Sequence, residues 1–356
     1  MLKKISLLVL CLCMTPSAMA ADLPTDFDAN SKYRLDFSDL NAVLRGSVLD
    51  MGPSTHRRAK KARKGTASRL SISNPLPSRL EGNRVMFDKF EDAQIGFLAN
   101  MRDDLLAVPS QVPIERLSRN EQLAYWFNLH NAIVLAEIAD QYPITNLDPL
   151  FDEDSDDAFY RQQKFDMNGT MISLKDIQDH VLSNWNDPRV IYGFYMGAIG
   201  TPNIRSTAYT GGTVYDQLNH NAVDFVNSVR GTQVWKKKEL RVATYYQRMS
   251  KQFPNFDQDV LTHVKKYSKK GFLNRLTEIE KVKARIADWH IADLYNGNLG
   301  QVGGSAASNT RDSLGLQIVS ALPDHVIELL RYRDEKNAKA KREGTVDVEE
   351  YAGNGN

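Results

Sequence analysis

The chain has 356 residues, of which 42% are hydrophobic and 25% charged, and it carries 45 basic and 44 acidic side chains. A formal net charge of +1 excludes a general electrostatic attraction to nucleic acid or to an anionic membrane surface. The length is sufficient to bury a sizeable hydrophobic core without help from disulfide bonds.

The first twenty residues have the layout of a secretory signal peptide. Residues 3–4 are lysines, residues 5–14 form an apolar run, and residues 18–20 read AMA, which is a small-x-small cleavage site. We therefore predict cleavage after Ala20 and a periplasmic or secreted protein. No later stretch reaches 18 consecutive apolar residues, so we expect no stable membrane insertion.

Both cysteines of the chain, Cys11 and Cys13, lie inside this predicted signal peptide. A mature chain that begins after Ala20 would contain no thiol, which excludes a cysteine nucleophile, a CxxC redox pair and a cysteine-ligated zinc site. Such a chain would enter an oxidising compartment without disulfides, so its stability would depend on core burial.

The rest of the sequence predicts more helices than strands. We expect helices over residues 37–49, 84–105, 118–141, 173–182, 211–229, 261–268 and 321–343. A hairpin is expected over 164–174 around Asn168–Gly169, and strands are expected over 189–200, 239–249 and 283–290. Strands that do not alternate regularly with helices favour an α+β fold, with one helix-rich main domain and a small, mostly antiparallel sheet.

The composition divides the predicted mature chain into three parts. Residues 21–83 form an N-terminal extension and linker, residues 84–335 the main α+β domain, and residues 336–356 a charged, flexible tail. The basic run at 56–65 has no interleaved aromatic residue, so we interpret it as a solvated helix end or loop. Residues 297–315 are predicted to form a flexible loop.

The segment NEQLAYWFNLHNAIVLAEIADQYP, residues 120–143, predicts a long helix with three polar side chains inside an apolar run. The pattern S-x-x-E at 118–121 indicates a capping box at its start. At 100° per residue, Asn128 and Asn131 fall on one face among small and apolar neighbours, whereas His130 falls on nearly the opposite face.

An asparagine amide that is buried without a partner costs on the order of 1–3 kcal/mol. We therefore predict that Asn128 and Asn131 bond to irregular backbone packed against the helix. The alternative is that the same amides face a ligand or stabilise an oxyanion. His130 shares its face with Glu137 and Asp140, so we expect a partly exposed histidine beside a carboxylate.

The sequence NEQLAYWFNLHNA resembles the signature of a family known as domain of unknown function 547, E-x-x-A-x-W-x-N-x-Y-N-A. The matching residues are Glu121, Ala124, Trp126, Asn128, Asn131 and Ala132, and His130 stands where tyrosine is usual. Other segments resemble the family in the same order, so that the resemblance extends over residues 84–330. It implies no established activity.

One departure from the family pattern concerns chemistry. The central strand and loop of the family usually read D-P-R-x-H-x-A-L-x-C-x-x-x-x-C-P, and the corresponding segment here is DPRVIYGFYMGAIGTP at 187–202. Ile191 occupies the histidine position, Met196 and Thr201 occupy the cysteine positions, and Pro202 is retained. If members of the family act through that histidine and those thiols, this chain lacks the groups.

Several candidate site residues follow from the family pattern and from local chemistry. A cluster with a binding or structural role is predicted from the residues that keep the family pattern: Glu121, Trp126, Asn128, Asn131, Arg189, Pro202, Asp288 and Trp289. Weak catalytic candidates are Thr201, Ser206 and His130, although GTPNIRST is more simply a turn with hydroxyl–backbone bonds. His220 and Asp224 share a helix face, but no third ligand accompanies them, so we predict no metal and no cofactor.

Two functions of different classes are consistent with the sequence. The favoured one is an exported, non-catalytic protein of the cell envelope that binds an unknown protein or small-molecule ligand, and not nucleic acid. The alternative is a cysteine-independent hydrolase or transferase acting on peptide or envelope polymer. Either function is expected to use a cleft between the 118–141 helix and the 196–206 loop.

Overall fold

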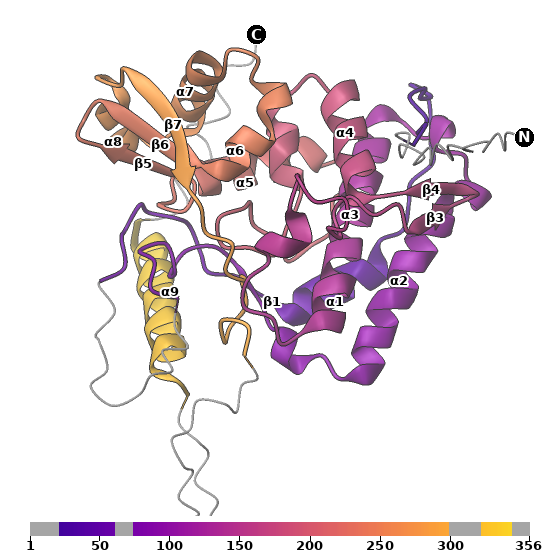
Figure 1. Cartoon of the computed structure of the whole chain (residues 1–356), viewed down its shortest axis with the longest axis horizontal. Helices are drawn as coiled ribbons and strands as arrows, with labels where there is room; N and C mark the ends of the chain where they lie inside the picture. The colour runs from indigo at the N-terminus through magenta and orange to yellow at the C-terminus, as the bar shows by residue number, and fades with distance from the viewer. Residues whose placement is uncertain (1–20, 61–73, 299–321, 344–356) are drawn as a thin grey trace, which may run out of the picture.

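The structure is a computed structural model that describes residues 21–60, 74–298 and 322–343 (Figure 1). The predicted signal peptide therefore lies outside the described residues. Residues 61–65 of the basic run and residues 299–315 of the predicted 297–315 loop also lie outside them. Within the described ranges, no helix is both long enough and apolar enough to cross a membrane.

Helix α3 (Arg119–Gln141) is the centre of the fold, and α2 (Asp92–Gln111) and α4 (Leu174–Asn184) pack beside it (Figure 1). It begins close to the predicted position, and the Ser118 side chain accepts a hydrogen bond from the Glu121 amide. Of its 23 residues, 18 are buried. A helix that is buried all round has no polar face, which is why the predicted exposed face around His130 is wrong.

The remaining helices surround this centre. They are α1 (Ser38–Ser47), α5 (Val214–Val226), α6 (Thr244–Arg248), α7 (Phe256–Tyr267), α8 (Lys270–Leu273) and α9 (Asp324–Glu343). Short 3-10 helices are η1 (Phe87–Lys89), η2 (Ile114–Arg116), η3 (Asp148–Phe151), η4 (Pro188–Gly193), η5 (Ser250–Gln252) and η6 (Asn274–Leu276). The predicted 84–105 helix starts later, because Glu91 and Gln94 form a capping box that begins α2 at Asp92.

The strands form three small sheets, so the described chain has the predicted α+β class. The strands are β1 (Val48–Leu49), β2 (Arg84–Val85), β3 (Phe165–Met167), β4 (Thr170–Ile172), β5 (Thr232–Trp235), β6 (Glu239–Ala243) and β7 (Lys281–Ile286). The pairs β1–β2, β3–β4 and β5–β6 are antiparallel, whereas β6–β7 is parallel. The β3–β4 hairpin turns at Asn168 and Gly169, both with positive φ, as the sequence predicted.

Two strand predictions are wrong. Residues 189–193 belong to η4 and the backbone from 194 to 200 is irregular, although every residue from 191 to 200 is buried. Residues 239–249 form β6 only as far as Ala243 and then turn into α6. A short apolar run indicates burial, but it does not distinguish a strand from irregular buried backbone. The peptide groups of irregular backbone can be hydrogen-bonded by side chains instead of by a neighbouring strand.

Both ends of the described chain pack onto the main body. Leu23 and Phe37 from the N-terminal segment belong to the main hydrophobic core, and each is 5% exposed. Leu329 and Tyr332 of α9 form a second small core with Met51 and Leu80. Helix α9 continues to Glu343, beyond the predicted start of the tail at 336.

Candidate functional site

Asn128 and Asn131 hold the irregular segment that follows η4 against α3. Asn128 Nδ2 donates to the Tyr209 carbonyl at 2.8 Å, and its Oδ1 accepts from the Tyr209 amide at 2.9 Å. Asn131 Nδ2 donates to the Gly193 carbonyl at 3.0 Å, and its Oδ1 accepts from the Tyr195 amide at 2.9 Å. The predicted bonds to irregular backbone are therefore present, and both amides are used within the protein.

His130 is not the partly exposed side chain that the helical wheel predicted, because it is fully buried. Its Nδ1 lies 3.1 Å from Asn131 Oδ1, which can only accept, so Nδ1 carries the proton. Its Nε2 lies 3.0 Å from Gln178 Nε2 and accepts from that amide. Burial lowers the pKa of His130 to about 3, so it is a neutral structural residue and not a general base.

Glu121 and Trp126 are also buried within the fold. Glu121 Oε1 accepts from the Leu35 amide at 2.8 Å, which attaches the N-terminal segment to the start of α3. Trp126 is fully buried, and its ring centroid lies 4.9 Å from that of His180. The first part of the helix signature thus serves packing and anchoring.

The hydroxyl candidates of the 196–206 loop lie in a turn. Thr201 is 2% exposed, and its hydroxyl donates to the Ala198 carbonyl at 2.8 Å, as the turn interpretation predicted. Pro202 is buried, and Ser206 is half-buried. The residues that flank this loop, Gly193 and Tyr195 before it and Tyr209 after it, are the ones that bond to Asn131 and Asn128 of α3.

Arg189 occupies a structural position at the start of η4. Its Nη2 forms an ion pair with Asp187 Oδ2 at 2.6 Å, and its guanidinium lies over the Tyr215 ring at 4.7 Å. Burial alone would raise the pKa of Asp187, but the hydrogen bonds and the charge of Arg189 outweigh burial and lower that pKa. The arginine thus joins η4 to α5.

The strongest candidate site is formed by Asp288 and His290. His290 Nδ1 lies 2.9 Å from Asp288 Oδ1; the Asp288 side chain is 1% exposed, whereas that of His290 is 41% exposed. Asp288 Oδ2 also accepts from the Ser78 hydroxyl at 2.7 Å, and Asn74 Nδ2 lies 3.3 Å from both carboxylate oxygens. A buried carboxylate therefore fixes the imidazole orientation through Nδ1, while the ring as a whole is partly exposed.

The backbone of the 196–206 loop lies directly behind this pair. The Gly200 amide donates to the Asp288 carbonyl at 2.8 Å, and the Ile199 amide donates to the His290 carbonyl at 2.9 Å. A Cβ at Gly200 would lie 2.8 Å from the same Asp288 oxygen, so the approach requires glycine. Trp289 points elsewhere and stacks on Phe151, with ring centroids 5.9 Å apart.

The electrostatics of His290 differ from those of the buried histidines. Its hydrogen bond to Asp288 raises its pKa above the ordinary value, and partial burial opposes this. By contrast, burial lowers the pKa of His56 and His263 to about 3. His290 therefore holds a proton more readily than the buried histidines and can present a positive charge toward a bound anion.

Replacing Asp288 with asparagine should lower the pKa of His290, because the amide keeps the shape of the carboxylate and loses its charge. An NMR titration of the His290 ring protons should show the decrease directly. The raised folded-state pKa also means that this pair stabilises the native state fully below the unfolded pKa of about 6.5. That contribution is lost as the pH rises through the folded pKa, and a titration curve unchanged by Asp288→Asn would contradict the pairing.

Asp224, which shares a helix face with His220, bonds to residues of other segments. The Asp224 carboxylate accepts from Arg230 Nη2 at 2.8 Å and from Asn203 Nδ2 at 2.6 Å. Its other oxygen accepts from the Ser54 amide at 3.0 Å. The carboxylate is thus part of a partly buried polar network, and no group of three potential ligands occurs among the described residues.

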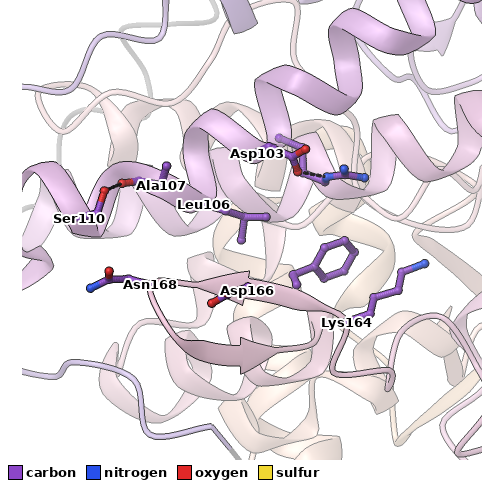
Figure 2. Close-up of a pocket in the computed structure, with 9 residues that line it drawn as sticks. Asp103, Leu106, Ala107, Ser110, Lys164, Asp166 and Asn168 are labelled. Atoms are coloured by element: carbon purple, nitrogen blue, oxygen red, sulfur yellow. Dashed lines mark hydrogen bonds and ion pairs between the residues drawn. The ribbon is translucent and has the colours of Figure 1, made fainter.

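A separate groove of about 510 Å³ lies between α2 and β3 (Figure 2). Its charged residues already have partners, since Arg102 Nε bonds to Asp103 Oδ1 at 2.8 Å and Lys164 Nζ bonds to Glu137 Oε2 at 3.1 Å. The groove is lined by none of the candidate site residues.

The sequence predicts Asp288 as a site residue but not three of the residues around it. His290 is absent from the predicted cluster, and Asn74 and Ser78 fall in the predicted linker. The signal for His290 is the spacing D-x-H in a segment predicted as extended, because residues two apart in a strand point to the same side. No local signal could have connected residues 74–78 with a carboxylate more than 200 positions away.

These features define an α+β protein with a structural asparagine pair on its central helix and a buried aspartate paired with a partly exposed histidine. Residues 114–226 match the family described as "Protein of unknown function, DUF547", so the predicted family assignment is confirmed over that segment. The match includes α3, α4, η4 and α5, whereas Asp288 and His290 lie outside it. No curated protein and no solved structure matches the chain.

Proposed function

We propose that the chain is an exported, non-catalytic protein of the cell envelope that binds a protein or small-molecule ligand through the Asp288–His290 pair. The observation that carries this proposal is that the hydroxyl of Thr201 is buried and already hydrogen-bonded. Thr201 stands at a cysteine position of the family pattern. It follows Gly200, whose amide bonds to Asp288, but its hydroxyl is buried and bonded to Ala198. The pair thus has an oriented imidazole, and the hydroxyl at the cysteine position of the pattern is already bonded within its own turn.

The alternative proposal is a hydrolase or transferase that does not use cysteine. A buried carboxylate bonded to Nδ1 of an exposed histidine is the arrangement by which hydrolases orient a general base. Such an enzyme would have to recruit the hydroxyl of Thr201 or Ser206 after a rearrangement of the turn. The binding proposal requires no rearrangement of this turn, and we favour it over the enzyme proposal for that reason.

Complementation of a deletion strain under envelope stress separates these proposals. We expect His290→Ala to fail to complement although the protein still folds, with a melting temperature lowered only by the loss of the bond to Asp288. Thr201→Val, which removes the hydroxyl while keeping the shape, should complement. His220→Ala is the matched control, because His220 is an exposed histidine on α5. Loss of complementation by a normally folded Thr201→Val protein would favour the enzyme, and full complementation by His290→Ala would refute the site.

The proposed export rests on the sequence of residues 1–20 and on the absence of cysteine after Cys13. Fractionation of cells that produce the full chain, followed by intact-mass measurement, tests it. We expect the exported fraction to contain a chain without residues 1–20. A chain of full mass confined to the cytoplasm would contradict export and leave the geometry of the Asp288–His290 pair unaffected.

A further inference from the structure

The N-terminal segment of the described chain is held in place rather than free. Leu23 is 5% exposed and lies in the main core, and Ala21 packs against the same core. The Asp26 carbonyl accepts from Gln122 Nε2 at 2.7 Å, and the Asp28 amide donates to the Leu117 carbonyl at 3.1 Å. Chain ends usually fray unless contacts of this kind fix them.

Ala21, the first residue after the predicted cleavage point, lies beside a buried carboxylate. Its backbone nitrogen donates to Asp176 Oδ1 at 3.3 Å. Asp176 is 9% exposed and completes the capping box of α4, where its Oδ2 accepts from the Ser173 amide at 2.9 Å and from the Ser173 hydroxyl at 2.6 Å. One carboxylate oxygen thus caps the helix, and the other faces Ala21.

We propose that Ala21 is a processing-dependent ion-pairing site: removal of residues 1–20 creates an α-ammonium group that forms a salt bridge with Asp176. In the cleavage, water adds across the Ala20–Ala21 peptide bond, so that Ala20 leaves with a carboxylate and Ala21 gains an amine, which takes up a proton. Before cleavage the same nitrogen is a neutral amide donor. This inference rests on the proposed export.

The physical consequence is that the processed chain is more stable than the precursor. A charge-assisted hydrogen bond is roughly twice as strong as a neutral one, and the near-complete burial of Asp176 reduces screening by solvent. A precursor without this pair would stay less tightly folded, which suits a chain that has to cross a membrane before folding.

The α-amino group itself provides the decisive measurement. In a chain prepared to begin at Ala21, the α-amine is labelled by reductive methylation with ¹³C and titrated by NMR. We expect its pKa to lie about 1 pH unit above that of the same group in the urea-unfolded chain. Asp176→Asn should remove this difference. An unperturbed α-amine in the native chain would overturn the proposal.

Two further variants keep the test independent of folding defects. Ser173→Ala removes a partner of the capping box but keeps the carboxylate, so it should lower the melting temperature and leave the α-amine pKa raised. If Asp176→Asn does not fold, a chain with one extra glycine before Ala21 displaces the ammonium with Asp176 intact, and its α-amine should titrate normally. A raised pKa in that chain would overturn the proposal.

Failure of the inference and failure of the proposed export give different results. An exported chain whose first residue is not Ala21 would refute the ion pair and leave export intact. A chain that keeps residues 1–20 would refute export, whereas the chain prepared to begin at Ala21 still tests the pair.

Discussion

Asn131→Ala is expected to lower the free energy of unfolding by about 3 kcal/mol, because it leaves several buried groups without partners. The Gly193 carbonyl, the Tyr195 amide and the His130 ring all bond to this one side chain. For a chain of this size, the melting temperature should fall by about 5 °C. Thermal unfolding followed by circular dichroism measures the change.

The same helix provides the controls for this experiment. Asn120→Ala makes the same replacement at an exposed position in the first turn of α3, and it should change stability by less than about 0.5 kcal/mol. Asn128→Ala breaks two hydrogen bonds, both to Tyr209, whereas Asn131→Ala breaks three. The loss of unfolding free energy for Asn128→Ala should therefore be intermediate, about 2 kcal/mol. Unchanged melting of the Asn131→Ala protein together with a lost phenotype would indicate that the asparagine contacts a ligand.

Gly297→Ala is expected to be the most damaging single replacement, costing about 4 kcal/mol. Gly297 has φ of +79°, where an L-residue costs about 1–2 kcal/mol. An added Cβ would also overlap the Ile144 carbonyl oxygen and lie 2.7 Å from Thr145 Cα, and such overpacking costs about 1–3 kcal/mol. Backbone atoms cannot yield as the end of a side chain can. Chemical denaturation of the two proteins measures the difference.

This replacement should also disturb the candidate site, because the neighbouring backbone supports His290. The Ile291 amide donates to the Thr145 carbonyl at 3.1 Å, and the Leu147 amide donates to the Trp289 carbonyl at 2.9 Å. Gly169→Ala is the matched control, since Gly169 has φ of +88° but no atom near an added Cβ. It should cost about 1 kcal/mol, and equal losses for the two proteins would show that crowding contributes nothing at Gly297.

The two asparagines show how far local pattern can lead. Buried amides in a long apolar helix must have partners, so their bonds to irregular backbone follow from the sequence alone. The identity of that backbone does not, because Gly193 and Tyr209 lie 62 and 81 positions from the asparagines that bond them. The signature therefore indicates that the asparagine amides bond to backbone, but it does not indicate which backbone residues they bond.

His130 and the segment 189–200 show why the remaining predictions failed. The helical wheel assigns an exposed face from composition alone, whereas α3 is covered by α2, α4 and the segment after η4. The apolar run at 189–200 is buried as predicted, but the asparagine side chains take the place of a strand partner. In both cases the deciding contacts come from distant parts of the chain.

The sequence by itself determined the α+β class, the asparagine pair, the hairpin at Asn168–Gly169 and the family resemblance confirmed over residues 114–226, because each depends on residues close together in the chain. Only the tertiary structure decided that His130 is buried and neutral, and that Asp288, His290, Asn74 and Ser78 form one site. Burial and the pairing of charges depend on what packs against a residue, and for these residues the packing partners are separated by up to 214 positions.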